Sequence, residues 1–145
     1  MGAGKSTKLK EIEESNRFFG YSFCDLDEMI FKNEGSGFNQ LGELIEKRGF
    51  EWFRSAELET LKNIWDGSSS WSALGGGALS ESVLEIIHSR EDIRGYFIDT
   101  DFDTCYKRIK DDTNRPLSKK SKFELKKLYE DRLSLYSQFK PLVIP

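Results

Sequence analysis

The chain has 145 residues, of which 37% are hydrophobic and 32% charged, and its formal net charge at pH 7 is −3. This length predicts one globular domain over residues 1–145, and the acidic balance argues against a protein that wraps a nucleic-acid backbone. No apolar run approaches the roughly 20 residues of a membrane span, and the N-terminal residues lack a signal peptide's apolar stretch. We therefore expect a cytoplasmic protein with neither a nucleic-acid nor a membrane partner. Cys24 and Cys105 lack metal-binding spacing and are expected to be reduced core thiols.

The first half of the chain alternates between helical and strand patterns. Leu9 and Ile12, three residues apart in a charged stretch, predict a helix from Lys5 to about Asn16. Gly20 ends this pattern; a short strand is expected over 21–24 and a polar loop over 34–39. Two helices are then predicted from their apolar residues, which are Leu41, Leu44 and Ile45 in the first, and Phe53, Ala56, Leu58, Leu61 and Ile64 in the second.

The second half continues the alternation and fixes the fold class. Strands are expected over 71–74, 96–98 and 142–144, and a polar, lysine-rich loop over 111–121. Helices are predicted from Val83, Ile86 and Ile87, over 105–110, and from Leu125, Leu128, Leu133 and Tyr136. Strands separated by helices predict an α/β fold whose parallel sheet is covered by helices on both faces. We find neither an internal repeat nor a linker, which supports a single domain.

A phosphate-binding pattern opens the chain. Gly2-Ala3-Gly4-Lys5-Ser6-Thr7 matches the second half of the P-loop pattern G-x-x-x-x-G-K-[ST]. In a P-loop, glycines let backbone N–H groups face phosphate oxygens, and the N-terminus of the next helix adds a favourable dipole. Lys5 would reach the β- and γ-phosphates, and the hydroxyl of Ser6 would bind Mg²⁺. The alternative is a flexible Gly/Ser terminus, but the helix predicted directly after it favours the P-loop.

Two carboxylates follow the first predicted strand. Asp25 and Asp27 lie at its carboxyl end, where open α/β sheets bind their ligands. Residues two apart on a strand share a face, so both side chains are expected on one side, suited to a metal and a substrate hydroxyl. The alternative for this weak pattern is a solvated strand end.

Further polar motifs follow in order. Arg54 and Glu57 are three residues apart on one predicted helix, where they can pair. Gly75-Gly76-Gly77 directly follows a strand, as a loop would whose backbone closely approaches a small ligand. Arg115 lies in the polar loop and Arg132 on the last helix. Taken singly, each arginine is more simply a surface charge than a ligand.

Together, G-K-S-T, D-L-D, F-R-x-x-E, G-G-G, R-P-L and R-x-x-L-Y resemble the shikimate kinase family along nearly the whole chain. The resemblance implies a P-loop kinase fold, a three-layer sandwich around a parallel sheet of order 2-3-1-4-5, with a lid at about 111–121. It also implies a monomer that uses ATP to convert shikimate to shikimate 3-phosphate, on the way to chorismate and the aromatic amino acids. Strand 1 and the first P-loop glycine are missing from the pattern, and we expect the natural protein to start upstream of Met1. The family's adenine-side loop would lie beyond Pro145, which puts ATP affinity in question.

By the same resemblance, Asp25 and Ser6 would hold Mg²⁺, and Asp27 would bind the substrate hydroxyl as general base. Arg54 and Arg132 would clamp the shikimate carboxylate, because a guanidinium fork matches a carboxylate. Glu57 would hold Arg54 in position, and Gly75, Gly76 and Gly77 would offer backbone N–H groups to the substrate ring. Arg115 would contact phosphate and substrate as the lid closes, and Arg108 would stack on adenine. The residues from Gly2 to Thr7 would bind the phosphates. Other residues are expected to be structural, namely His88 and the core aromatics Phe18, Phe19 and Phe31.

Two other functions remain open at this point. One is another small P-loop kinase, acting on gluconate or a nucleoside monophosphate. A nucleotide acceptor would need a base-binding pocket, whereas two arginines suit a carboxylate. The other is a catalytically impaired, nucleotide-binding remnant of the fold, which the shortened P-loop would support and the retained Lys5, Ser6, Asp25, Asp27 and Arg115 oppose.

Overall fold

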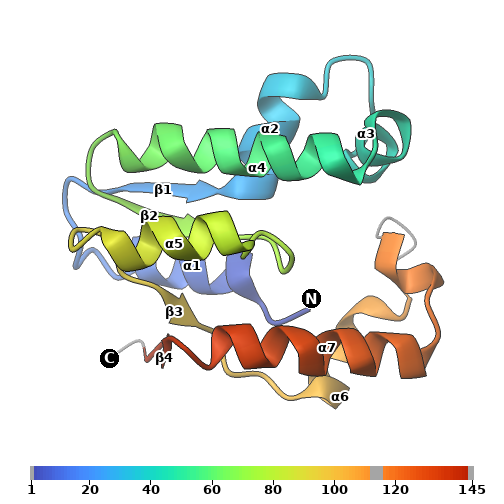
Figure 1. Cartoon of the computed structure of the whole chain (residues 1–145). Coiled ribbons are helices and arrows are strands. Elements are labelled where there is room, and N and C mark those ends of the chain that lie inside the picture. Colours follow the sequence, from blue (N-terminus) through green and yellow to red (C-terminus); the bar gives the residue numbers. More distant parts are fainter. Residues whose placement is uncertain (1, 112–115, 144–145) are drawn as a thin grey trace. The chain divides into compact units, whose positions relative to one another are not determined.

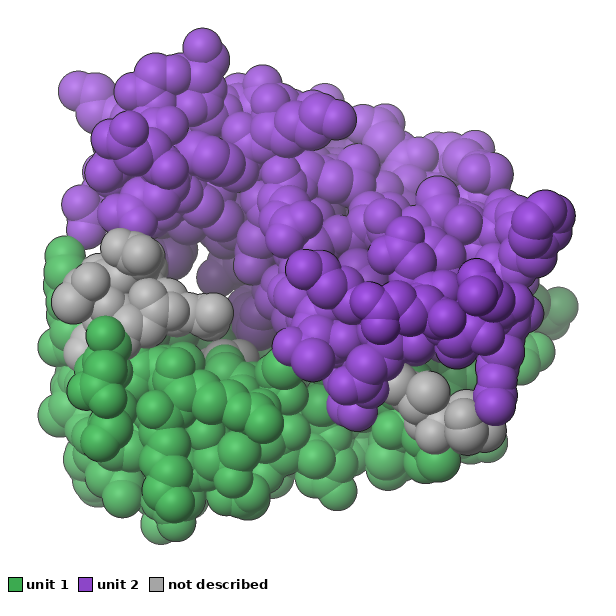
Figure 2. Space-filling model, turned by 180° about the vertical axis from the view of Figure 1, so that it is seen from behind, with its two compact units in different colours: residues 1–4, 79–145 green, residues 5–78 purple. Residues whose placement is uncertain are grey.

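The structure is a computed structural model that describes residues 2–111 and 116–143 (Figure 1). The chain forms two compact units, one of residues 5–78 and the other of residues 1–4 and 79–145 (Figure 2). The sequence boundary between them falls inside the predicted P-loop, between Gly4 and Lys5. The single domain expected over residues 1–145 stays a prediction.

The unit of residues 5–78 is built on two parallel strands. Strand β1 (Ser22–Asp25) pairs with β2 (Ser70–Ala73). Helix α1 (Lys5–Glu14) packs against both strands, and α2 (Leu26–Glu34) packs against β1 and against α4 (Phe50–Trp65). In Figure 1, α1 and α4 lie on opposite sides of the strands. The remaining helix, α3 (Leu41–Arg48), packs on α2 and α4. The buried apolar side chains of this unit are Ile12, Leu26, Ile30, Leu44, Ile45, Phe53, Leu61 and Ala78.

Helix α2 was not predicted from the sequence patterns, and neither was a 3₁₀ helix over Pro116–Lys119, inside the segment predicted as a loop. The first residue of α2 follows β1 directly, so the chain turns from strand to helix at Asp25. The aspartate caps the helix, since its carboxylate accepts a hydrogen bond from the backbone N–H of Asp27 at 3.1 Å. The signals were present: a capping residue, acidic side chains in the first turn, and apolar Leu26 and Ile30 four residues apart. The short strand pattern before them concealed the start of the helix.

The described residues of the other unit form the following elements: α5 (Glu81–Ser89), β3 (Tyr96–Phe97), α6 (Phe102–Ile109), the 3₁₀ helix η1 (Pro116–Lys119), α7 (Lys122–Tyr136) and β4 (Lys140–Pro141). Side-chain caps begin its three α-helices: Ser80 on α5, Asp101 on α6, and a Ser121–Glu124 capping box on α7. Its buried apolar side chains are Val83, Ile87, Cys105, Ile109 and Leu125.

The strands give the neighbour pairs that the resemblance implied. In the family's order 2-3-1-4-5, removing strand 1 leaves strand 2 beside strand 3 and strand 4 beside strand 5. These four family strands correspond to β1, β2, β3 and β4 of this chain. The described residues form two two-stranded parallel sheets, β1–β2 and β3–β4. The last strand lies two residues earlier than predicted, because Tyr96 is opposite Lys140 and Phe97 opposite Pro141. The backbone N–H of Leu142 still donates to the carbonyl of Phe97 at 2.8 Å, while Ile144 lies outside the described residues.

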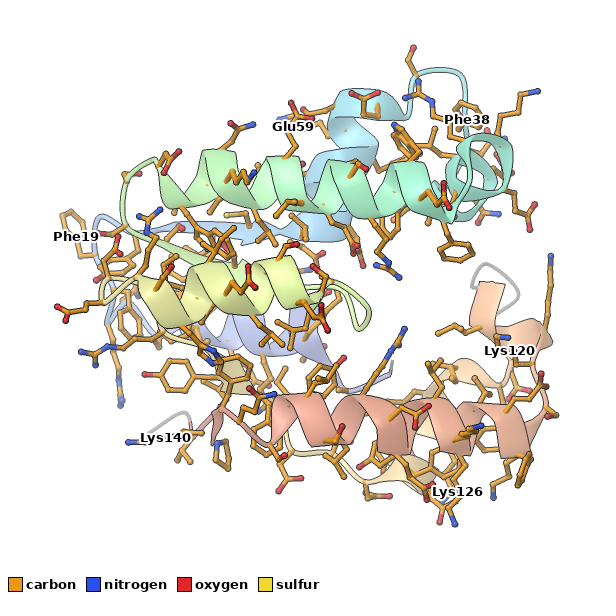
Figure 3. All side chains as sticks on the ribbon, in the orientation of Figure 1. Phe19, Phe38, Glu59, Lys120, Lys126 and Lys140 are labelled. Carbon is orange, nitrogen blue, oxygen red and sulfur yellow. The ribbon has the colours of Figure 1, made fainter. Side chains whose placement is uncertain are left out.

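One aromatic predicted for the core is on the surface. Phe18 packs edge-on against Tyr21 and Trp71, with ring centroids 5.6 and 5.0 Å apart, while Phe19 is fully exposed (Figure 3). Adjacent side chains in this turn point to different sides, so only one of the two can join the cluster. In the described part of the chain, every helix is too short or too polar to cross a membrane.

Candidate active site

Lys5, Ser6 and Asp25 form the centre of the site. The Nζ of Lys5 lies 2.9 and 2.8 Å from the two carboxylate oxygens of Asp25, and the Ser6 hydroxyl donates to Asp25 at 2.5 Å. Lys5 and Ser6 begin α1, whereas Asp25 ends β1. The packing of α1 on β1 therefore brings the P-loop residues to the carboxylate, as the sequence predicted for the carboxyl end of a strand.

The carboxylate of Asp25 is buried and charged. Burial alone would raise its pKa, but hydrogen bonds from Lys5 and Ser6, the charge of Lys5 and the backbone N–H of Asp27 together hold the pKa below its usual value. Only 6% of the residue is exposed. At neutral pH, Asp25 is therefore an ionised carboxylate whose oxygens accept hydrogen bonds or bind a metal. Side chains of the P-loop and the start of α2 hold it in place.

Asp27 belongs to the same cluster, but it lies on a helix and not on the strand where the sequence predicted it. The sequence suggested that both aspartates project from one face of a strand, but Asp27 lies in the first turn of α2. Lys5 bridges the two, with its Nζ 3.2 Å from an oxygen of Asp27. The Asp27 side chain is one-third exposed, at 33%, whereas that of Asp25 is 5% exposed. Asp27 can thus meet a ligand from solution while Asp25 is enclosed.

Arg54 and Glu57 pair on α4 as predicted. The guanidinium of Arg54 donates to Glu57, whose side chain is only 2% exposed, and it lies over the ring of Phe53, 5.4 Å from its centroid. Glu57 fixes the guanidinium, and the half-buried Arg54 keeps part of its surface toward solvent.

Gly75 lies close to the carboxylates of Asp27 and Glu57. A Cβ built on this glycine would stand 3.0 Å from an oxygen of Asp27 and 3.1 Å from an oxygen of Glu57. The glycine follows β2 in sequence, so its backbone, Asp27 and Glu57 meet at the end of one strand. A side chain at position 75 would press on these two carboxylate oxygens, whereas glycine leaves them in place.

The first P-loop residues belong to the other unit and contact two of its side chains. Arg108 donates to the carbonyl of Gly2 at 2.9 Å, and Thr100 donates to the carbonyl of Ala3 at 3.2 Å. Gly2 has a positive φ of 61°, and a Cβ there would stand 2.5 Å from the carbonyl oxygen of Cys105 on α6. Gly2 is therefore required both by its backbone conformation and by close packing.

The remaining predicted residues are placed as follows. Arg132 lies on α7 and lines a small cavity of about 40 Å³ with Ala3, Thr100 and Tyr129. Arg54 and Arg132 belong to different units, so the predicted clamp stays a prediction. Arg115 lies outside the described residues, Thr7 is exposed, and Gly76 and Gly77 are half-buried in the turn after β2. The contact of Arg108 with adenine is likewise a prediction.

The oxygen ligands that Ser6 and Asp25 offer suit Mg²⁺ more than a transition metal. Ser6 and Asp25 offer a hydroxyl and a carboxylate oxygen in contact with each other. Mg²⁺ typically takes one or two protein oxygens and completes its shell with water and substrate phosphates. Within residues 2–111 and 116–143, no group of three or more His, Cys, Asp or Glu side chains could hold a metal by itself. Phosphate oxygens would have to supply the other ligands.

Thr100 and Tyr129 were not singled out from the sequence. Thr100 lies between β3 and α6, and its backbone carbonyl accepts a hydrogen bond from the hydroxyl of Tyr129 at 2.9 Å. A threonine after a short strand and a tyrosine in a long helix carry no motif, so only the fold reveals that Thr100 contacts the P-loop and that Tyr129 contacts Thr100.

Known proteins resemble this chain along nearly its whole length. The family model for shikimate kinase matches residues 1–145, the whole chain. The chain is 32% identical to the shikimate kinase of Persephonella marina, over 95% of this chain and 80% of the relative, and 34% identical to that of Aquifex aeolicus, over 95% and 78%. A crystal structure of the Aquifex aeolicus shikimate kinase superimposes with a TM-score of 0.77 at 33% identity, covering 99% of this chain and 81% of the other. The shikimate kinase of Acinetobacter baumannii, solved in complex with shikimate, gives a TM-score of 0.82 at 25% identity, covering 100% and 80%.

These matches span nearly the full chain, and the resemblance found in the sequence is confirmed. The architecture is that of a P-loop kinase. The chain belongs to the shikimate kinase family.

Proposed function

We propose that this chain transfers the γ-phosphate of ATP to a hydroxyl of shikimate, giving shikimate 3-phosphate for the synthesis of chorismate and the aromatic amino acids. The observation that carries the proposal is the bridge made by Lys5, whose Nζ lies 2.8 Å from Asp25 and 3.2 Å from Asp27. It joins a P-loop lysine, a metal-binding carboxylate and a partly exposed carboxylate in one cluster, in a chain of the shikimate kinase family.

Charge neutralisation and positioning carry the catalysis in this proposal. Phosphoryl transfer needs little covalent chemistry from the protein, so fixed positive charge around the transferred group matters most. Lys5, held by Asp25, is oriented toward the phosphates, and the backbone N–H groups from Gly2 to Thr7 surround their oxygens. Ser6 and Asp25 hold Mg²⁺, which when bound neutralises phosphate charge.

Asp27 accepts the proton of the substrate hydroxyl. Its carboxylate is partly exposed and lies beside Lys5, which supports this role. A positioned general base typically contributes on the order of 10²–10⁴-fold to the rate. Gly75, Gly76 and Gly77 offer backbone N–H groups to the ring of the substrate.

The carboxylate of the substrate is bound by arginines. Arg54, fixed by buried Glu57, and Arg132 bind it through charge-assisted hydrogen bonds. Arg115 closes on phosphate and substrate from the lid at about 111–121 and excludes water, which would otherwise accept the phosphate. Arg108 contacts adenine. The protein acts as a single-domain monomer.

A substrate screen tests the proposal against its rivals. The purified chain is assayed for ADP release with ATP and Mg²⁺ in the presence of shikimate, gluconate or a nucleoside monophosphate, and without an acceptor. We expect release only with shikimate. Release with gluconate or a nucleotide would indicate another small-molecule kinase, and ADP binding without any turnover would indicate an impaired remnant. Omission of Mg²⁺ should abolish the activity.

A further inference from the structure

We propose that Thr100, supported by Tyr129, is a positioning residue that orients the phosphate-binding loop. The inference rests on the proposed use of ATP by this chain, and it assigns a role to two residues outside the motifs of the site. Both residues and the loop carbonyl that they control belong to the same unit, residues 1–4 and 79–145.

The hydroxyl of Thr100 fixes one peptide plane of the loop. It donates to the carbonyl oxygen of Ala3 at 3.2 Å. The described chain has no cis peptide bond, and in a trans peptide the carbonyl and the following N–H point in opposite directions. Drawing the Ala3 carbonyl toward Thr100 therefore turns the N–H of Gly4 away from it. A backbone N–H that points away from Thr100 in this way can donate a hydrogen bond to a phosphate oxygen.

A second side chain acts in the same way one peptide earlier. Arg108 donates to the carbonyl of Gly2 at 2.9 Å, which turns the N–H of Ala3 away from Arg108. Arg108 is exposed on α6, whereas Thr100 is half-buried. The loop is thus oriented through its carbonyls by two side chains, of which Thr100 has the more enclosed position.

Tyr129 holds Thr100 in place. Its hydroxyl, on α7, donates to the backbone carbonyl of Thr100 at 2.9 Å. Burial, followed by the nearby Cys105, Asp99 and Asp101, raises the pKa of Tyr129, so the phenol keeps its donor proton at neutral pH. Ala3, Thr100 and Tyr129, which these two hydrogen bonds connect, also line the same cavity of about 40 Å³.

The Thr100 hydroxyl has no comparable role in the structure of its own segment. Helix α6 is capped by Asp101, whose side chain accepts from the backbone N–H and the hydroxyl of Thr104 at 2.9 and 2.7 Å. Thr100 lies outside the helix, and its hydroxyl donates to the loop. Thr104 consequently provides a matched control, since it is another threonine, and its hydroxyl donates to Asp101 at the start of α6.

Binding of ADP tests the proposal independently of catalysis. Thr100→Val keeps the shape of the side chain and removes the hydroxyl; we expect the ADP dissociation constant to rise by about 2- to 12-fold, the range that one hydrogen bond usually contributes. Thr100→Ser should restore binding, and Tyr129→Phe should weaken it by a smaller factor. The double variant should lose less than the product of the two single losses, because both act on one segment. Thr104→Val should leave ADP binding near the wild-type value.

Kinase assays and thermal unfolding separate positioning from a loss of fold. The KM for ATP should rise in Thr100→Val while the KM for shikimate stays near that of the wild type, and melting temperatures should not follow the order of ADP affinities. An unchanged ADP affinity in Thr100→Val, an equal loss in Thr104→Val, or a wild-type chain that does not bind ADP would overturn the proposal. A wild-type chain that binds ADP without phosphorylating shikimate would overturn the proposed function alone, and the ADP series would still decide the role of Thr100.

Discussion

The ammonium of Lys5 is within hydrogen-bond distance of both carboxylate oxygens of Asp25, at 2.9 and 2.8 Å. The two residues are 20 positions apart and come from a helix start and a strand end. Their contact positions the lysine before any phosphate arrives, and it explains how a buried aspartate stays ionised.

Lys5→Met should reduce turnover. Loss of one preorganised charge at a transition state typically costs on the order of 10²–10³-fold in kcat. Steady-state kinetics with ATP and shikimate measure the loss. Lys8→Met is the matched control, because Lys8 lies on the same helix and pairs with Glu11 at 2.6 Å on its outer face. Equal activity of the two variants would contradict the role of Lys5.

Asp27→Asn should lower kcat by about 10²–10⁴-fold, since the amide cannot accept the hydroxyl proton as a carboxylate does. ADP binding should persist, because the proposed nucleotide contacts are made by Lys5 and the loop backbone. Glu28→Gln, at the exposed neighbouring position, controls for the loss of a negative charge in the first turn of α2. If Asp27→Asn keeps a kcat close to that of the wild type, the aspartate only positions the substrate.

Arg54→Ala and Arg132→Ala should each raise the KM for shikimate far more than the KM for ATP. A charge-assisted hydrogen bond is worth about 1.5–3 kcal/mol, which corresponds to roughly 10- to 150-fold. Arg94→Ala, at an exposed position, is the control for loss of a surface cation. A rise in the KM for ATP with an unchanged KM for shikimate would refute the assignment of either arginine to the carboxylate.

Gly75→Ala should raise the KM for shikimate and lower kcat together. The added methyl group would stand 3.0 Å from an oxygen of Asp27 and 3.1 Å from an oxygen of Glu57, so the proposed general base and the partner of Arg54 would both have to shift. Gly67→Ala introduces a similar methyl group near the carbonyl of Ile64 at 3.3 Å, after the end of α4, and should affect stability only. Wild-type kinetics in Gly75→Ala would show that the carboxylates tolerate displacement.

Acid should remove the stability that Asp25 contributes. Its pKa in the folded protein lies below the ordinary value of 3.8, so the contribution is fully present above that value and is lost as the pH falls through the lower folded-state pKa. Denaturant unfolding of the wild type and of Asp25→Asn should therefore show a gap in unfolding free energy at pH 6 that narrows on acidification toward pH 3. A gap that stays constant or widens on acidification would contradict a lowered pKa.

Much of the fold was predictable from the sequence because local patterns determine it. The helix from Lys5, the strands near residues 22 and 71 and the helix ending at Tyr136 all follow from apolar spacing and turn residues. Helix α2 was missed because Asp25 both ends a strand and caps a helix. Phe19 was wrongly assigned to the core because composition alone does not tell which of two adjacent phenylalanines a turn exposes.

The candidate site was likewise only partly predictable from the sequence. Lys5, Ser6, Asp25, Asp27, Arg54 and Glu57 were found by motif, and the structure brings the first four into one cluster and the last two into a pair. Thr100 and Tyr129 were not found, since their contacts join segments that are far apart in the sequence and depend on tertiary packing. Arg115 lies outside the described residues, and its role stays a prediction.

The most direct test of the account is the identity of the product. The purified chain is incubated with ATP, Mg²⁺ and shikimate, and ³¹P NMR and mass spectrometry follow the phosphate, with Lys5→Met as the background. We predict one new phosphomonoester with the mass of shikimate phosphate, which forms in step with ADP and is nearly absent with Lys5→Met. Release of inorganic phosphate at the same rate with and without shikimate, with no phosphorylated acid formed, would contradict the account.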